Sequence, residues 1–554
     1  MEAQFADSSP VPAHDVLIVG GGLAGLTLAL QLKQRCGDLR ILVLERREHP
    51  VPLAAHKVGE STVEIGAHYF RDVLGLAAHL GEAQLRKFGF RFFFSEGRRD
   101  IDQVTEIGVS RHLAVPSHQI DRGSFENFLG QEVVRRGIEF VDSATVRSID
   151  LAESDGLPHR VTYSRGGTEQ VAAGRWLVDA GGRAGLLKRK LGLAETNPHE
   201  AHAVWFRVRD HIRVDEWSRD AAWRARCDPP ARWLSTNHLV GAGYWVWLIP
   251  LSSGAHSVGI VADPRIHPLE AMDTFDKAMT WLERYQPRLF DELDGKRDRL
   301  MDFAYFRRFS YGCKQVYSSR RWALAGEAGM FLDPFYSPGS DFIAISNTYI
   351  AELVARDHAG EPFAALAQIY DQILRSFYES TMALYIDQYP IFGDAEVLPV
   401  KVIWDYTYYW GVLSQLFFQQ RLTDLSALAA LRTELAHCRR LNLAVQAFLR
   451  AWSERSAKRN VAVMHDQAKL AWFAELNRSL LDRLDGDAFR ERVRQSTRQL
   501  RSLAKEMVER ATAEHAGLDA GPLRAVLDEA PQLGAWKDSE AGMSAPTSMF
   551  FAAA

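Results

Sequence analysis

The sequence is poor in cysteine, with four among 554 residues and no C-x-x-C pair. Scattered single cysteines argue against a disulfide framework and against a zinc site, and they fit a reducing compartment. Neither sign of charge is in excess, because the formal net charge is only −4. This balance indicates neither nucleic acid nor an acidic membrane surface as a partner.

Long apolar runs are also missing. The most apolar stretch, residues 16–32, is interrupted by glycines and is too short for a membrane span. Residues 1–14 have neither the basic start nor the apolar centre of a signal peptide. We therefore expect a cytoplasmic protein without an integral membrane segment, and its 554 residues suffice for at least two packed units.

Glycines stand at one informative place, directly after a run of β-branched apolar residues. Residues 16–19 predict a buried parallel strand, and G-x-G-x-x-G follows at Gly20, Gly22 and Gly25 before a helix. The first glycine permits a tight turn, the second lets a pyrophosphate approach the backbone, and the third lets helix and strand pack closely. The helix N-terminus would offer free N–H groups to the phosphates.

A second strand, residues 41–44, ends in Glu45, which can accept a hydrogen bond from a ribose hydroxyl. This strand–helix–strand context favours a dinucleotide site over the alternative, a glycine-rich turn in an ordinary helix–sheet domain. The motif alone does not separate FAD from NAD. Residues 176–183, a strand followed by a glycine turn, resemble the segment that closes the FAD domain of aromatic-hydroxylase-type flavoproteins, which favours FAD.

Two tryptophans mark another strand, Tyr244-Trp245-Val246-Trp247-Leu248-Ile249-Pro250. Alternation along a strand places Trp245 and Trp247 on one face, and a packed core alone would explain that. The pattern W-x-W-x-I-P nevertheless resembles the signature of flavin-dependent halogenases. Residues 59–62 (G-E-S-T), 323–329 (A-L-A-G-E-A-G) and 331–340 (F-x-x-P-x-x-S-x-G) carry the same resemblance, to phenol- and pyrrole-type members rather than tryptophan-specific ones.

The resemblance covers residues 15–350 and implies site residues. A lysine in a K-x-G segment, here Lys87, would be catalytic, and Lys57 is a competing candidate. Trp245 and Trp247 would separate flavin from substrate, and Ser337, Gly339 and Ser340 would hold halide. The FAD contacts would be Gly20, Gly22, Leu23, Ala24, Gly25, Glu45, Arg46, Ser61, Arg122, Glu327, Pro334 and Gly339.

Three positions depart from the family pattern. Glu327 replaces an aspartate in the segment near the ribityl chain. Tyr336 stands where tryptophan-specific members have a glutamate, which argues against free tryptophan as the substrate. Pro338 has no N–H, although backbone N–H groups hold the halide in the family. Gly339 and Ser340 still have N–H groups that could hold a halide.

The predicted fold is an α/β, Rossmann-like FAD-binding domain of the aromatic-hydroxylase type, with an antiparallel substrate sheet and a helical C-terminal domain. We assign residues 1–384 to the FAD-binding domain, with the substrate sheet inserted at about 85–120 and 200–310. From residue 350 onward the chain reads as almost wholly helical. Residues 385–516 would form the helical domain and 517–554 a loose tail.

The resemblance implies that reduced FAD and O2 oxidise chloride or bromide to hypohalous acid, which halogenates an electron-rich aromatic ring near the lysine. A separate flavin reductase would supply FADH2, since the sequence has one dinucleotide motif, and some relatives act on rings tethered to carrier proteins. Three alternatives are a flavin monooxygenase, a flavin-dependent reductase or dehydrogenase, and a flavin-binding protein without turnover. Pro338 favours the first, and W-x-W-x-I-P opposes it.

Overall fold

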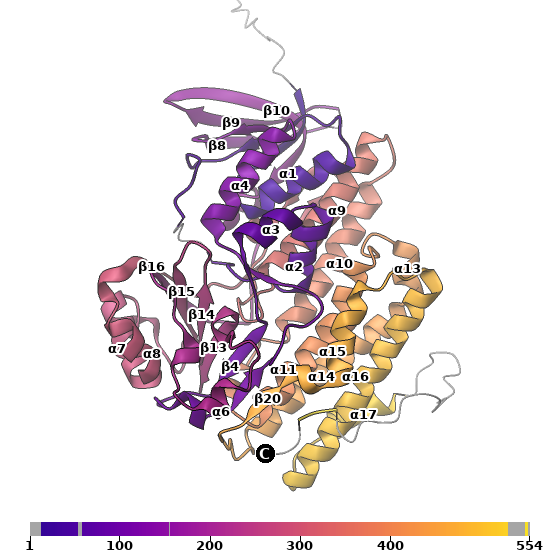
Figure 1. Cartoon of the computed structure of the whole chain (residues 1–554). Coiled ribbons are helices and arrows are strands. Elements are labelled where there is room, and N and C mark those ends of the chain that lie inside the picture. Colours follow the sequence, from indigo (N-terminus) through magenta and orange to yellow (C-terminus); the bar gives the residue numbers. More distant parts are fainter. Residues whose placement is uncertain (1–12, 54–57, 155, 530–548, 552–554) are drawn as a thin grey trace, which may run out of the picture.

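The structure, a computed structural model, describes residues 13–53, 58–154, 156–529 and 549–551. Two eight-stranded sheets lie one below the other in Figure 1, with the C-terminal helices beside the lower sheet. This arrangement confirms the predicted fold class, an FAD-type α/β unit with a second, largely antiparallel sheet and a helical C-terminal region. The domain boundaries at 384 and 516 stay predictions.

The first sheet is built around β1 (Ala13–Val19), as the glycine motif predicted. β1 lies parallel to β2 (Ile41–Leu44) on one side and to β10 (Thr168–Asp179) on the other. Residues 16–19 are buried, which explains their apolar, β-branched character. α1 (Leu23–Arg35) leaves β1 through the glycine turn and packs against α9 (Gly339–His358).

The two faces of the second sheet pack against different helices of the chain. In β14 (Tyr244–Pro250), Tyr244, Val246 and Leu248 share a core with α7 (Phe275–Tyr285) and α8 (Pro287–Asp294). Trp245 and Trp247 point to the other face, as the alternation predicted, and share a core with the C-terminal helices. The strand order is β16 (Leu300–Phe306), β12 (His202–Val208), β15 (His256–Ala262), β14, β13 (Thr236–Gly241), β4 (Phe90–Phe93), β5 (Glu106–Gly108) and β20 (Met464–Asp466).

The C-terminal region is mainly helical, as expected, but two elements correct the details. β20 pairs in parallel with β5, so a strand from this region completes the second sheet. α17 (Gly521–Asp528) lies in the segment expected to be a loose tail, and that expectation is wrong for these residues because Leu523 and Leu527 are buried. The main helices are α10 (Ala364–Met382), α11 (Val397–Tyr408), α14 (Arg432–Ser453), α15 (Ala471–Arg478) and α16 (Gly486–Glu514).

No helix among the described residues is both long and apolar enough to cross a lipid bilayer.

Candidate functional site

A cavity of about 700 Å³ lies where the first sheet meets the second. The carboxyl end of β1 opens into it, which is where ligands bind in open α/β sheets. All predicted FAD, halide and barrier residues except Gly25 line this cavity, and Lys87 does not. They are Gly20, Gly22, Leu23, Ala24, Glu45, Arg46, Ser61, Arg122, Trp245, Trp247, Glu327, Pro334, Ser337, Gly339 and Ser340.

The three motif glycines have distinct local roles. Gly20 has φ +111°, a conformation that side chains disfavour. A Cβ on Gly25 would lie 2.0 Å from the Gly20 carbonyl oxygen, so Gly25 packs the helix onto the turn and does not face the cavity. A Cβ on Gly22 would meet no atom within 4 Å, so the backbone beside Gly22 is open to a ligand. This geometry fits a pyrophosphate at the N-terminus of α1.

Two charged groups border the same cavity. The Glu45 carboxylate accepts a hydrogen bond from the Gly21 N–H at 2.7 Å, which ties the end of β2 to the glycine turn. Arg122 begins α4 (Arg122–Arg135), directly after the helix cap Asp121, and its guanidinium donates to the Val58 carbonyl at 2.7 Å. Burial lowers the pKa of Arg122 to about 10. The roles of Glu45 and Arg122 in FAD binding stay predictions.

The turn predicted to bind halide, residues 336–340, has a strained backbone and N–H groups without a helical acceptor. Tyr336 and Ser337 have φ of 67° and 52°, in the left-handed region that non-glycine residues rarely adopt. The Ser337 N–H donates to the Pro334 carbonyl at 2.8 Å, so Ser337 can offer a halide only its hydroxyl. Gly339 and Ser340 begin α9, where N–H groups have no helical acceptor. The buried Ser340 hydroxyl has no hydrogen-bond partner within the described residues.

The two tryptophans of β14 border the cavity and are fixed by hydrogen bonds. The Trp247 indole donates to the Ser257 hydroxyl at 3.1 Å, and the Trp245 indole donates to the Tyr389 hydroxyl at 3.2 Å. Tyr389 in turn donates to the Asp333 carboxylate at 2.6 Å, one residue before Pro334. The C-terminal region therefore helps to hold the wall of the cavity.

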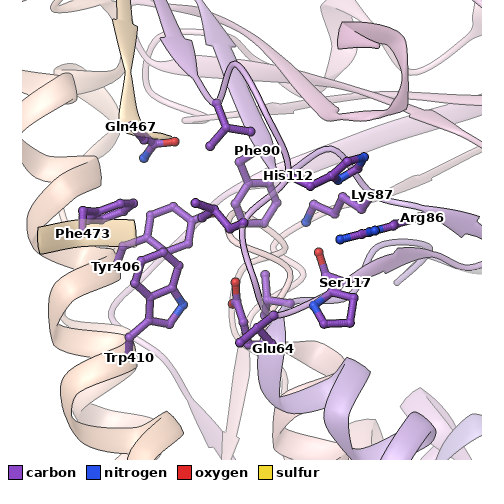
Figure 2. A pocket seen from close by; sticks show the side chains of 16 residues that line it. Glu64, Arg86, Lys87, Phe90, His112, Ser117, Tyr406, Trp410, Gln467 and Phe473 are labelled. Atoms are coloured by element: carbon purple, nitrogen blue, oxygen red, sulfur yellow. The ribbon is translucent and has the colours of Figure 1, made fainter. Parts of the chain in front are cut away.

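Lys87 lies in a second cavity, of about 30 Å³, shown in Figure 2. Its Nζ donates to the Ser61 hydroxyl at 2.9 Å and to the Thr62 carbonyl at 3.0 Å, and it lies 3.4 Å from the centroid of the Phe90 ring. Burial lowers the pKa of the Lys87 ammonium to about 7, in the direction expected for a lysine among phenylalanines.

Ser61 connects the two cavities. It lines the larger one and accepts the hydrogen bond of Lys87, which lines the smaller one. Neither Ser61 nor Thr62 caps the helix that follows. α2 (Glu64–His68) has Val63 at its N-cap, and Ser61 pairs with Gln119 in an isolated bridge. The competing Lys57 lies outside the described residues.

Sequence patterns missed several residues of the smaller cavity. Glu64 follows the G-E-S-T segment but matches no motif, and Tyr406, Trp410 and Phe473 come from helices more than three hundred residues away along the chain. Residues 385–418 are rich in aromatic side chains, and two of these, Tyr406 and Trp410, form part of the cavity wall. His238 in the larger cavity was also missed, and burial lowers its pKa to about 3.

Comparison with known sequences agrees with this geometry. Residues 13–253 match the family described as FAD binding domain. The chain is 26% identical to the flavin-dependent halogenase chlA of Dictyostelium discoideum, over 74% of this chain and 71% of that protein. It is 27% identical to the tetracycline 7-halogenase of Kitasatospora aureofaciens, over 65% of this chain and 68% of that protein.

A carrier-protein enzyme and a solved structure extend the comparison. A 1H-pyrrole-2-carbonyl-[peptidyl-carrier protein] brominase of Pseudoalteromonas luteoviolacea is 26% identical over 60% of this chain and 75% of its own length. The structure of halogenase PltM in complex with phloroglucinol and FAD matches 92% of this chain and 98% of that one, with a TM-score of 0.62 and 18% identity. The chain shares that fold, and its FAD binding domain and open glycine turn fit FAD.

Proposed function

We propose that the chain is a flavin-dependent halogenase that uses FADH2, O2 and chloride or bromide to halogenate an electron-rich aromatic substrate. The substrate ring would be phenolic, pyrrolic or indolic. The observation that carries this proposal is the contact between Lys87, in the smaller cavity, and Ser61, which lines the FAD cavity. A group released at the flavin could reach a buried lysine across that contact.

The protein's own residues have separate tasks in this proposal. Bound FADH2 would supply, with O2, the oxidation of halide to hypohalous acid. The free N–H groups of Gly339 and Ser340 at the start of α9 would hold the anion, where the helix dipole is favourable. Trp245 and Trp247 would keep substrate away from the flavin. Lys87 would hydrogen-bond the hypohalous acid and donate the proton that its leaving oxygen needs.

We predict that halide binds beside Gly339 and that bromide is preferred, because bromide is easier to oxidise and the turn lacks the Pro338 N–H. Gly339→Val should raise the halide concentration for half-maximal product by about tenfold or more, since it hinders a charge-assisted hydrogen bond. A Cβ at Gly339 meets no atom within 4 Å, so the variant should fold. Equal product formation in halide-free buffer would exclude a halide site.

We predict that the purified protein oxidises NADPH only slowly, because the sequence contains one dinucleotide motif and FAD accounts for it. Adding a separate flavin reductase with NADH should start turnover, as measured by reduced nicotinamide consumption. Rapid NADPH consumption stimulated by substrate, without a reductase, would favour the second candidate. That candidate is an oxygen-inserting monooxygenase, which the missing N–H of Pro338 favours.

The form in which the ring is presented also belongs to the proposal. The brominase from Pseudoalteromonas luteoviolacea acts on a pyrrole carried by a peptidyl-carrier protein. We extend this to a carrier-tethered substrate as one option for this chain. Comparing a free acid with its carrier-bound thioester in the same assay would decide between the two forms.

A further inference from the structure

Glu64 has a buried carboxylate that the proposed function does not use. It begins α2 and lines the small cavity together with Lys87. Its side chain lies in the same opening as Lys87 in Figure 2, and the residue is 7% exposed. One carboxylate oxygen accepts a hydrogen bond from the Asn477 amide at 3.4 Å, and the Trp410 indole is a neighbouring donor, but Oε2 has no well-oriented hydrogen bond within the described residues. A buried acceptor that is not fully hydrogen-bonded is costly, so a ligand hydroxyl that donates to Glu64 would be stabilised there.

The surroundings of Glu64 suit a flat ring. Phe90, Tyr406, Trp410 and Phe473 form aromatic walls of the same cavity (Figure 2). Glu64 and Lys87 line the same cavity, and the charge of each acts on the other, although no ion pair joins them among the described contacts. The volume of about 30 Å³ is smaller than a benzene-type ring, so a ring can enter only when lining side chains change rotamer.

We propose, on the basis of the proposed function, that Glu64 accepts the hydroxyl proton of a phenol, so that the substrate class is phenols with a free hydroxyl next to the halogenated carbon. Lys87 would then face the carbon that is attacked, while Glu64 holds the oxygen. Burial raises the pKa of the Glu64 carboxyl, which makes its anion a better base.

Glu64 and Lys87 together accept and supply every proton that this step needs. The phenol O–H bond breaks and its proton goes to the Glu64 carboxylate, while the ring carbon forms a bond to the halogen of hypohalous acid. The halogen–oxygen bond breaks, and the leaving hydroxide takes a proton from the Lys87 ammonium to give water. The Lys87 amine then removes the proton of the attacked carbon, and Glu64 returns its proton to the oxygen.

Binding tests this inference without turnover. Resorcinol and 1,3-dimethoxybenzene have similar rings, but only resorcinol can donate to Glu64. By calorimetry, the wild-type protein should bind resorcinol at least about tenfold more tightly, as expected for a hydrogen bond to a charged group. Glu64→Gln keeps the shape and the Asn477 contact and should remove this preference. Glu82→Gln, at an exposed position of α3 (Ala77–Ala83), is the matched control and should keep it.

Turnover gives a second readout. Glu64→Gln should halogenate resorcinol about a hundredfold more slowly, the usual scale of a lost general base, while its FAD content and flavin oxidation stay at wild-type values. A Glu64→Gln variant that keeps both the binding preference and the resorcinol rate would overturn the inference. If the wild-type protein forms no halogenated product, the proposed function fails, and the binding comparison still decides the role of Glu64.

Discussion

Lys87→Ala should lose halogenated product by roughly a hundredfold or more while it still binds FAD and oxidises reduced flavin, which is the usual scale for a lost acid–base group. FAD binding and flavin oxidation should persist because Lys87 lines the small cavity and does not line the FAD cavity. Halide oxidation would therefore continue without it. The measurement is halogenated product per flavin oxidised, by mass spectrometry.

Controls separate chemistry from packing in this experiment. Lys87→Met keeps most of the side-chain volume and removes Nζ, so it should fail as Lys87→Ala does. Lys87→Arg should also fail, because guanidinium is wider and does not release its proton. Lys277→Ala, at an exposed position of α7, should be unaffected. If Lys87→Ala keeps its yield and Lys57→Ala loses it, the catalytic lysine is Lys57; if both keep it, no lysine mechanism applies.

The same assignment predicts a pH dependence. The pKa of Lys87 is lowered to about 7 by burial, which outweighs the opposing charges of Glu64 and Asp341. Arg86 and His112 line the same cavity. Because the ammonium form is the proton donor, the yield per flavin oxidised should fall as the pH rises through about 7.

Gly22→Val should give protein without the yellow cofactor, with affinity for FAD reduced by at least about a hundredfold, or roughly 2.8 kcal/mol. Gly22 has φ −86° and ψ −171°, which valine adopts readily, and a Cβ there meets no protein atom within 4 Å. The added methyl groups would instead occupy the expected path of the pyrophosphate.

The control for this variant is Gly37→Val, in the turn after α1, where the nearest atom to a built Cβ is 4.0 Å away. Visible flavin absorbance per protein and circular dichroism report occupancy and folding. A folded Gly22→Val protein with full FAD occupancy would show that the pyrophosphate site lies elsewhere.

The FAD site could be predicted from the sequence because its residues lie close together along the chain. The strand, the three glycines and Glu45 lie within thirty residues, Gly20 and Gly25 have backbone reasons to be glycine, and Gly22 leaves room for the expected pyrophosphate. Trp245 and Trp247 were predictable for a similar reason, since alternation along one strand settles their face.

The cavity around Lys87 was harder to predict because segments that are far apart in the sequence form it. Phe473 and Tyr406 reach Lys87 only after the C-terminal helices pack on the second sheet, and no short pattern records that packing. The left-handed turn at Tyr336 and Ser337 directs the Ser337 N–H to the Pro334 carbonyl, which is a geometric detail that no sequence pattern records.

Halogenation itself is tested most directly by one assay of the wild-type protein with reduced FAD, O2 and phenolic or indolic test compounds, with and without bromide or chloride. The proposed function predicts halogenated product by mass spectrometry only when halide is present, with more product from bromide than from chloride. Hydroxylated or reduced product that forms equally without halide, and no carbon–halogen bond with it, would contradict the proposal.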